Sequence, residues 1–151
     1  MNPAAARAGT LALVAMALAG CRAPAPPTVP SAPSPTDACR AVSDSLAAAV
    51  LPGQSLAELQ ARGIRVRTPI AFPPGSMPPA GPPAGAAVQA MISADGEVVP
   101  GSPRTLKSIG DPQLARALEA GALSMRFDFD AGAKPTTPVP FVATFAACAR
   151  S

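Results

Sequence analysis

The residue types that most enzymes use for catalysis are scarce in this sequence of 151 residues. It contains no histidine, tryptophan or tyrosine, which excludes imidazole chemistry and leaves five phenylalanines as the aromatic side chains. The clustered candidates are Asp128 and Asp130, which an extended strand would place about 7 Å apart on one face. Two carboxylates at that separation could hold a metal ion or act as an acid and base pair.

Several features argue against catalysis at this aspartate pair. No nucleophile with a base, no histidine ligand and no glycine-rich phosphate loop accompanies Asp128 and Asp130 in the sequence, and the exposed face of a half-buried strand ordinarily carries such residues. We therefore predict a protein that is not an enzyme, with no cofactor, no metal site and no small-molecule substrate.

Cysteine supplies the second kind of chemistry. The apolar run at 11–19 follows Arg7 and precedes small residues, which is typical of a secretory signal peptide and too short for a membrane span of about twenty residues. The segment Leu18-Ala19-Gly20-Cys21, which begins within this run, resembles the lipobox of bacterial lipoproteins. The resemblance implies cleavage before Cys21 and attachment of lipid to its thiol. The alternative is an ordinary secretory signal with Cys21 as a spare thiol.

A lipidated Cys21 would place the protein on a membrane. Two or three acyl chains anchor a protein stably, because each buried methylene contributes about 0.8 kcal/mol. Arg22 does not resemble the aspartate that commonly retains lipoproteins at the inner membrane. We therefore predict a lipid-anchored, periplasm-facing protein of the cell envelope, at the outer membrane.

The two remaining cysteines, Cys39 and Cys148, form a natural pair once Cys21 is consumed. A disulfide between them would join the two ends of the folded part and close a loop of about 110 residues, worth up to about 4 to 5 kcal/mol on the chain-entropy model. The alternative is two buried free thiols.

Composition sets the domain organisation. The net charge of +3 is small and scattered, which argues against nucleic acid as a partner. Residues 22–37 contain six prolines and no apolar periodicity, so they indicate an extended tether of roughly 50 Å. The predicted divisions are a signal peptide at 1–20, the lipidated cysteine and linker at 21–37, a helical extension at 38–68 and the main domain at 69–151.

Turn residues and apolar periodicity predict the elements of the folded part. The order is helix, helix, strand, strand, strand, helix, strand, strand, an α+β domain with helices packed on one side of a small antiparallel sheet. The first half comprises a helix from Asp37, a helix with a capping box at 55–58 that ends at Gly63, and a short strand from Ile64. The second half comprises a hairpin at 86–102, a helix that starts at Asp111-Pro112, and strands at 125–129 and 139–145.

Two arginines stand out on the short strand that starts at Ile64. Arg65 and Arg67 alternate with Ile64 and Val66, so both point to one face. They could meet a phosphate or an acidic partner, but a solvated strand edge is the favoured interpretation for charges at this spacing.

Four segments together resemble the C-terminal domain of TonB-type energy transducers: "GAAVQAMISADGEVV", "SIGDPQLARALEAG", "MRFDF" and "GAKPTTPVPFVATF". The likeness covers about residues 69–146. It implies a periplasmic module that binds an extended peptide or envelope protein segment as an added strand at a sheet edge. The candidate edge is the last strand, with Val139, Phe141, Val142, Ala143, Thr144 and Phe145.

Three departures limit what the resemblance implies. The sequence has neither a long membrane span nor the histidine-bearing face with which an energy transducer docks its motor, so energy transduction is disfavoured. The family's proline before its turn is missing from "FDFDA", and Pro138 and Pro140 lack amide donors on one side of the last strand. We predict a peptide-binding envelope lipoprotein. The alternatives are a structural envelope lipoprotein without peptide capture and a divergent energy transducer for transmembrane transport.

Overall fold

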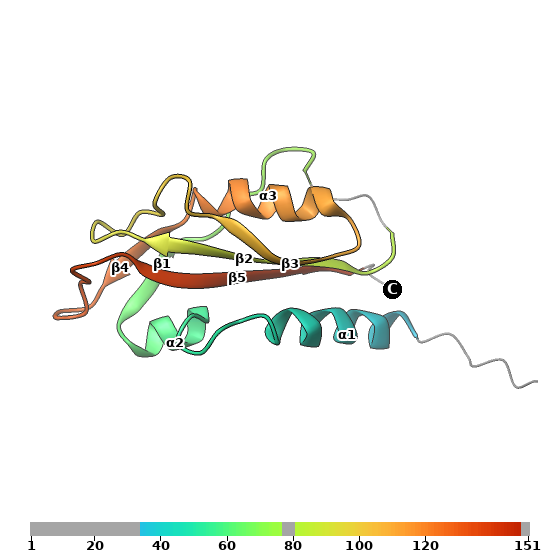
Figure 1. Cartoon of the computed structure of the whole chain (residues 1–151), viewed down its shortest axis with the longest axis horizontal. Helices are drawn as coiled ribbons and strands as arrows, with labels where there is room; N and C mark the ends of the chain where they lie inside the picture. The colour runs from blue at the N-terminus through green and yellow to red at the C-terminus, as the bar shows by residue number, and fades with distance from the viewer. Residues whose placement is uncertain (1–33, 77–80, 149–151) are drawn as a thin grey trace, which may run out of the picture. The chain divides into compact units, whose positions relative to one another are not determined.

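The computed structural model describes residues 34–76 and 81–148. It is an α+β structure in which helices and strands succeed one another as predicted, except that the third strand lies at 104–109 and not in the predicted hairpin (Figure 1). They are α1 (Pro35–Ala47), α2 (Leu56–Ala61), β1 (Ile64–Thr68), β2 (Ala84–Ile92), β3 (Arg104–Ile109), α3 (Pro112–Ala122), β4 (Arg126–Phe129) and β5 (Val139–Ala147). The predicted signal peptide, Cys21 and most of the linker lie outside the described residues, and no described helix is long and apolar enough to cross a membrane.

The strands form two antiparallel sheets, where we predicted one. The larger has the order β3-β2-β5, and the smaller pairs β1 with β4. The β2 and β5 strands pair along their whole length, from Ala84 opposite Ala147 to Ile92 opposite Val139. The small sheet packs through Ile64 and Phe127 into the same apolar core as Phe141 of β5, so the two sheets share one interior.

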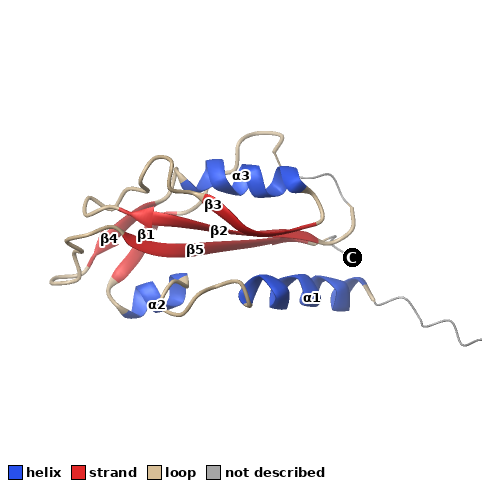
Figure 2. Ribbon diagram, in the orientation of Figure 1, coloured by secondary structure: helices blue, strands red, loops and turns tan. Residues whose placement is uncertain are grey.

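Helices cover both faces of the larger sheet, so the prediction of helices on one side is wrong. Figure 2 shows α3 on one face and α1 with α2 on the other. Alternate residues of β2 serve the two faces: Ala86 and Val88 pack against α3 residues, whereas Ala87 packs against Val42 and Leu46 of α1. Small side chains make this possible, because they let a helix approach closely on each side.

Gly85 illustrates how close that approach is. A β-carbon built on Gly85 would lie 2.6 Å from Leu46 Cδ1 and 2.9 Å from Val42 Cγ1, well inside van der Waals contact. Any side chain here would push α1 off the sheet.

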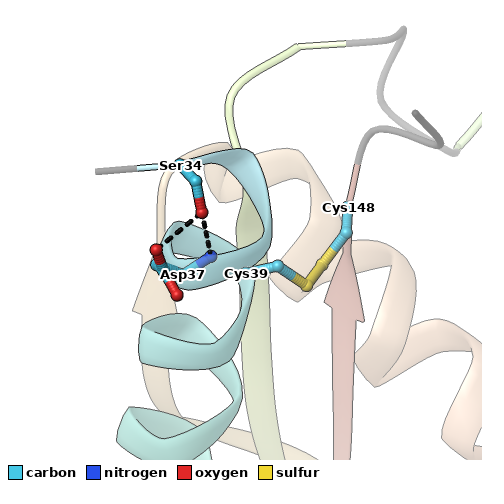
Figure 3. Close-up of a disulfide and its surroundings, with 4 residues drawn as sticks. All are labelled: Ser34, Asp37, Cys39 and Cys148. Carbon is cyan, nitrogen blue, oxygen red and sulfur yellow. Dashed lines mark hydrogen bonds between the residues drawn. A yellow bond between two sulfur atoms is a disulfide. The ribbon is translucent and has the colours of Figure 1, made fainter. Parts of the chain in front are cut away.

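The helix starts follow the predicted local chemistry, with one correction. Ser55 and Glu58 form the predicted capping box of α2, and Asp111 caps α3 with proline in its first turn. The α1 helix, however, is capped by Ser34 and not by Asp37: the Asp37 backbone N–H donates to Ser34 Oγ at 3.1 Å (Figure 3). Pro35 is tolerated in the first turn, where its missing N–H needs no partner, so the folded part begins inside the segment predicted as linker.

The predicted hairpin at 86–102 is only partly correct. Gly96 adopts φ 77° at its turn, and a β-carbon there would lie 2.1 Å from the Phe127 carbonyl oxygen. The chain after the turn forms isolated bridges, Val98 to Ile92 and Glu97 to Arg126, and no continuous strand. Gly101, with φ 76°, ends it, and the long pairing with β2 comes from β3, which the sequence analysis did not predict.

The predicted disulfide is present. Cys39 near the start of α1 and Cys148 just after β5 are joined, with their Cα atoms 5.8 Å apart and a separation of 109 positions in sequence (Figure 3). The bridge ties α1 to the end of β5 across the face that Val42 and Leu46 cover.

Candidate functional site

The free edge of β5 is the most distinctive surface of the described residues. Backbone groups of neighbouring strand residues point alternately to opposite sides. The Val142 N–H points away from β2, since it donates to the Gln54 carbonyl at 2.8 Å. The N–H groups of Thr144 and Ala146 therefore point the same way, and neither has a hydrogen-bond partner among the described residues. They are donors available to an added strand.

A cavity of about 370 Å³ lies along this stretch of β5 and is mostly apolar. We call it the β5 groove. Its lining comes from β5, the segment before and at the start of α2, β1, residues 69–72 and the residue before β4: Val50, Ser55, Leu56, Val66, Pro69, Ile70, Phe72, Met125, Val142, Ala143, Thr144 and Phe145. An extended backbone on the β5 edge would place its side chains against these apolar groups.

One wall of the groove is the irregular segment at 69–72. The Ala71 N–H donates to Ser124 Oγ at 2.9 Å, and Gly121 of α3 lets the segment lie close, since a β-carbon there would be 3.0 Å from the Ala71 carbonyl oxygen. The Phe72 ring then lies 4.8 Å, centroid to centroid, from that of Phe145. Contacts with Gly121 of α3 and with Ser124 just after it thus hold the segment and place an aromatic pair beside the open edge.

The turn that leads into α2 also lines the groove, through Ser55 and Leu56. The Glu58 carboxylate accepts hydrogen bonds from the Ser55 hydroxyl at 2.6 Å, the Gly53 N–H at 3.0 Å and the Ser55 N–H at 3.1 Å. These bonds, first that from the Ser55 hydroxyl, hold the pKa of Glu58 below its ordinary value, because they favour the charged form. Arg62 Nη1 adds a bond to the Gly53 carbonyl at 3.1 Å. The turn is therefore fixed by side chains of α2.

The predicted edge residues divide at Val142. Val142, Ala143, Thr144 and Phe145 line the groove. Val139 and Phe141 do not: Phe141 is fully buried in the core, edge to face with Phe127 at a centroid distance of 5.1 Å. Pro140 has no N–H to offer on the outer side, as the sequence predicted, so the usable edge lies in the second half of the strand.

The walls of the groove were missed by sequence analysis. Leu56, Ile70 and Phe72 come from segments that are far apart along the chain. The alternation of Ile70 and Phe72 within a proline-rich stretch was the available signal, because it indicates an extended segment with one apolar face.

The aspartates singled out in the sequence are ion-paired across the small sheet. Arg65 Nη2 lies 2.8 Å from Asp130 Oδ2, and Arg67 Nη1 lies 3.3 Å from Asp128 Oδ1. All four side chains are about half exposed or more. Each carboxylate faces an arginine of β1, so the arrangement is a cross-strand charge ladder that accounts for both the arginines and the aspartates. The described residues contain no group of three or more acidic or cysteine side chains able to hold a metal ion.

The other edge of the larger sheet, formed by β3, is closed by side chains. Leu106 is an extra residue opposite β2, which bulges the strand. Glu119 of α3 accepts from both the Thr105 N–H and the Thr105 hydroxyl at 2.7 Å. Lys107 adds a charge. Bulges, charges and blocked donors are the usual protections of an edge against strand addition.

Compared with known proteins, the sequence matches no protein-family model and no curated protein. The functional argument therefore rests on the geometry of the β5 groove.

Proposed function

We propose that this protein is an envelope lipoprotein, without enzymatic activity, whose folded part binds an extended peptide segment by strand addition at the β5 groove. The observation that carries the proposal is the coincidence of open backbone donors with an apolar cavity: the outward N–H groups of Thr144 and Ala146 lie where Phe145 and its neighbours line the groove. Main-chain hydrogen bonds give such a complex its affinity, and the cavity selects side chains.

The geometry indicates the chemistry of the ligand. Alternate side chains of an added strand point to one face, and the groove presents mainly Leu, Ile, Val and Phe side chains to that face. The preferred peptide is therefore short, extended and apolar at every second position. The likeness of residues 69–146 to the TonB C-terminal domain supports the same mode of binding and an envelope protein as its source.

Binding is tested with a soluble strand-forming probe, Ac-Lys-Thr-Val-Thr-Val-Thr-Lys-NH2, titrated into the isotope-labelled full chain in detergent. We expect the Thr144 and Ala146 amides to shift and to gain protection from exchange. The Thr144→Pro substitution should abolish this binding, because it removes an outward donor and leaves the pairing with β2 intact.

Ser108→Pro is the matched control for Thr144→Pro. Ser108 is an exposed hydroxyl residue whose N–H points outward on the β3 edge, so its substitution should leave probe binding unchanged. Equal loss of binding in both variants, with unchanged thermal unfolding, would contradict the proposed edge.

A structural lipoprotein without peptide capture is the second candidate. It is favoured by the proline at 140 and by the Gln54 carbonyl on Val142, which leave only the second half of β5 open. Failure of the probe to perturb any β5 amide in the wild-type protein would favour this structural role.

Placement in the envelope is a separate proposal that rests on Cys21. The Cys21→Ala substitution should abolish globomycin-sensitive processing and release the protein from the membrane fraction, with Cys39→Ala as the control that retains the anchor. Unchanged membrane retention of the Cys21 variant would overturn the lipid anchor.

A further inference from the structure

A buried amide lies at the centre of the larger sheet. Gln89 of β2 is 7% exposed and is the buried polar side chain of the described core. Its Oε1 accepts from Nε and Nη2 of Arg104 on β3, and its Nε2 donates to Gln54 Oε1. The relay thus runs from the β3 strand, across β2, to the turn that lies outside β5.

The far end of this relay closes the first half of the β5 edge. Gln54 uses its side chain to accept from Gln89 and its backbone carbonyl to accept from the Val142 N–H at 2.8 Å. Because both groups belong to one residue, the anchored side chain restrains the carbonyl. An unpaired amide at a buried position is costly, so Gln89 adds a restraint on Gln54 to those that Glu58 places on the flanking Gly53 and Ser55.

The Gln54 carbonyl bonded to the Val142 N–H, which we call the Val142 cap, decides where a ligand strand can pair. Upstream of Val142 the outward position is a proline, Pro140. Pro140 therefore has no outward N–H, and the outward N–H of Val142 is already bonded to Gln54. The first outward N–H that is available to a ligand strand is that of Thr144, followed by that of Ala146. Building on the proposed function, we propose that Gln89 is a positioning residue of the β5 groove: through Gln54 it blocks Val142 and sets the register of the bound peptide to start at Thr144.

This role differs measurably from simple core packing. Val142 and Ala143 are adjacent, but their N–H groups point to opposite sides: that of Val142 to Gln54 and that of Ala143 to Val88 of β2. A residue that only stabilises the sheet would change the exchange of both amides together. A residue that holds the cap changes that of Val142 alone.

The experiment measures amide hydrogen exchange by NMR on the full chain in detergent, for wild type and Gln89→Leu, a nearly isosteric change. We expect exchange at Val142 to rise about tenfold or more, as loss of a restrained hydrogen bond predicts, with Ala143 changed by less than about twofold. Gln54→Leu, at a half-buried position, is the second variant and should act alike. Gln113→Leu, an exposed glutamine on α3, is the control without effect.

The same variants are then titrated with the strand-forming probe. In wild type we expect the probe to protect the Thr144 and Ala146 amides from exchange. In Gln89→Leu we expect the probe to protect the Val142 amide as well. Unchanged exchange at Val142, an equal rise at Ala143, or pairing at Val142 already in wild type would each overturn the register role. A selective rise at Val142 with no probe bound to either protein would support the cap and overturn the proposed function instead.

Discussion

Both edges of the larger sheet carry outward backbone N–H and C=O groups, but the β3 edge is protected against strand addition and the second half of the β5 edge is not. On β3, a bulge at Leu106, the Lys107 charge and the Glu119 carboxylate on Thr105 leave little for another strand to pair with. On β5, the chain closes only the first half, through Pro140 and the Gln54 carbonyl. Beyond Val142 the donors stay open and an apolar cavity lies beside them.

This contrast indicates that the open stretch of β5 is a feature of the fold and not a consequence of its being an edge. Natural proteins protect exposed edges because an unpaired strand recruits other strands. The protection on β3 is built from its own side chains and α3, whereas that on β5 stops where the groove begins. An unprotected segment beside an apolar cavity is the arrangement expected of a peptide-binding edge.

The largest effect should come from the disulfide at the end of the open edge. Cys39→Ser together with Cys148→Ser should lower the free energy of unfolding by about 2 to 5 kcal/mol, because the bridge closes a long loop in the unfolded chain. Denaturant unfolding of the two forms measures the change. The single substitution Cys21→Ser is the control, since Cys21 takes no part in the bridge. Equal denaturant midpoints of unfolding for the oxidised and the doubly substituted protein would show that α1 packs on β5 equally well without the disulfide.

A charge placed in the β5 groove should show whether the probe binds at the β5 edge, without unfolding the protein. Val66 lines the groove and is 41% exposed, so Val66→Asp should cost little stability. It should weaken the probe about tenfold or more, because a carboxylate opposite apolar ligand side chains must be desolvated. Leu123 is equally exposed but lies outside the groove lining, which makes Leu123→Asp the matched control. Equal affinity for both variants would place the ligand elsewhere.

The smallest effect should come from opening the protected edge. Glu119→Ala removes the acceptor of the Thr105 N–H and should cost about 0.5 to 1.5 kcal/mol. Exchange at the Thr105 amide should rise, while probe binding at Thr144 stays as in wild type. Glu97→Ala, an exposed glutamate that faces Arg126, provides the comparison. A Thr105 amide that stays protected would show that the bulge alone closes β3.

Local signals in the sequence predicted much of the scaffold. The capping box at Ser55, the Asp111 cap and the Gly96 turn depend on residues within a few positions of one another, and all three are present. The β3 strand was missed, since "RTLKSI" lacks strict alternation and its bulge at Leu106 breaks the period of two. The second sheet was missed because the pairing of β1 with β4 joins residues about 60 positions apart.

The sequence by itself determined the elements other than β3, the pairing of Cys39 with Cys148 and the half of β5 that its prolines exclude, because each depends on residue chemistry, count or spacing along the chain. Tertiary structure alone decided that helices cover both faces, that the aspartates face arginines, and that Gln54 closes Val142 while Thr144 stays open. Those outcomes depend on which distant segments lie side by side. Apolar periodicity specifies that a face is buried but not what buries it.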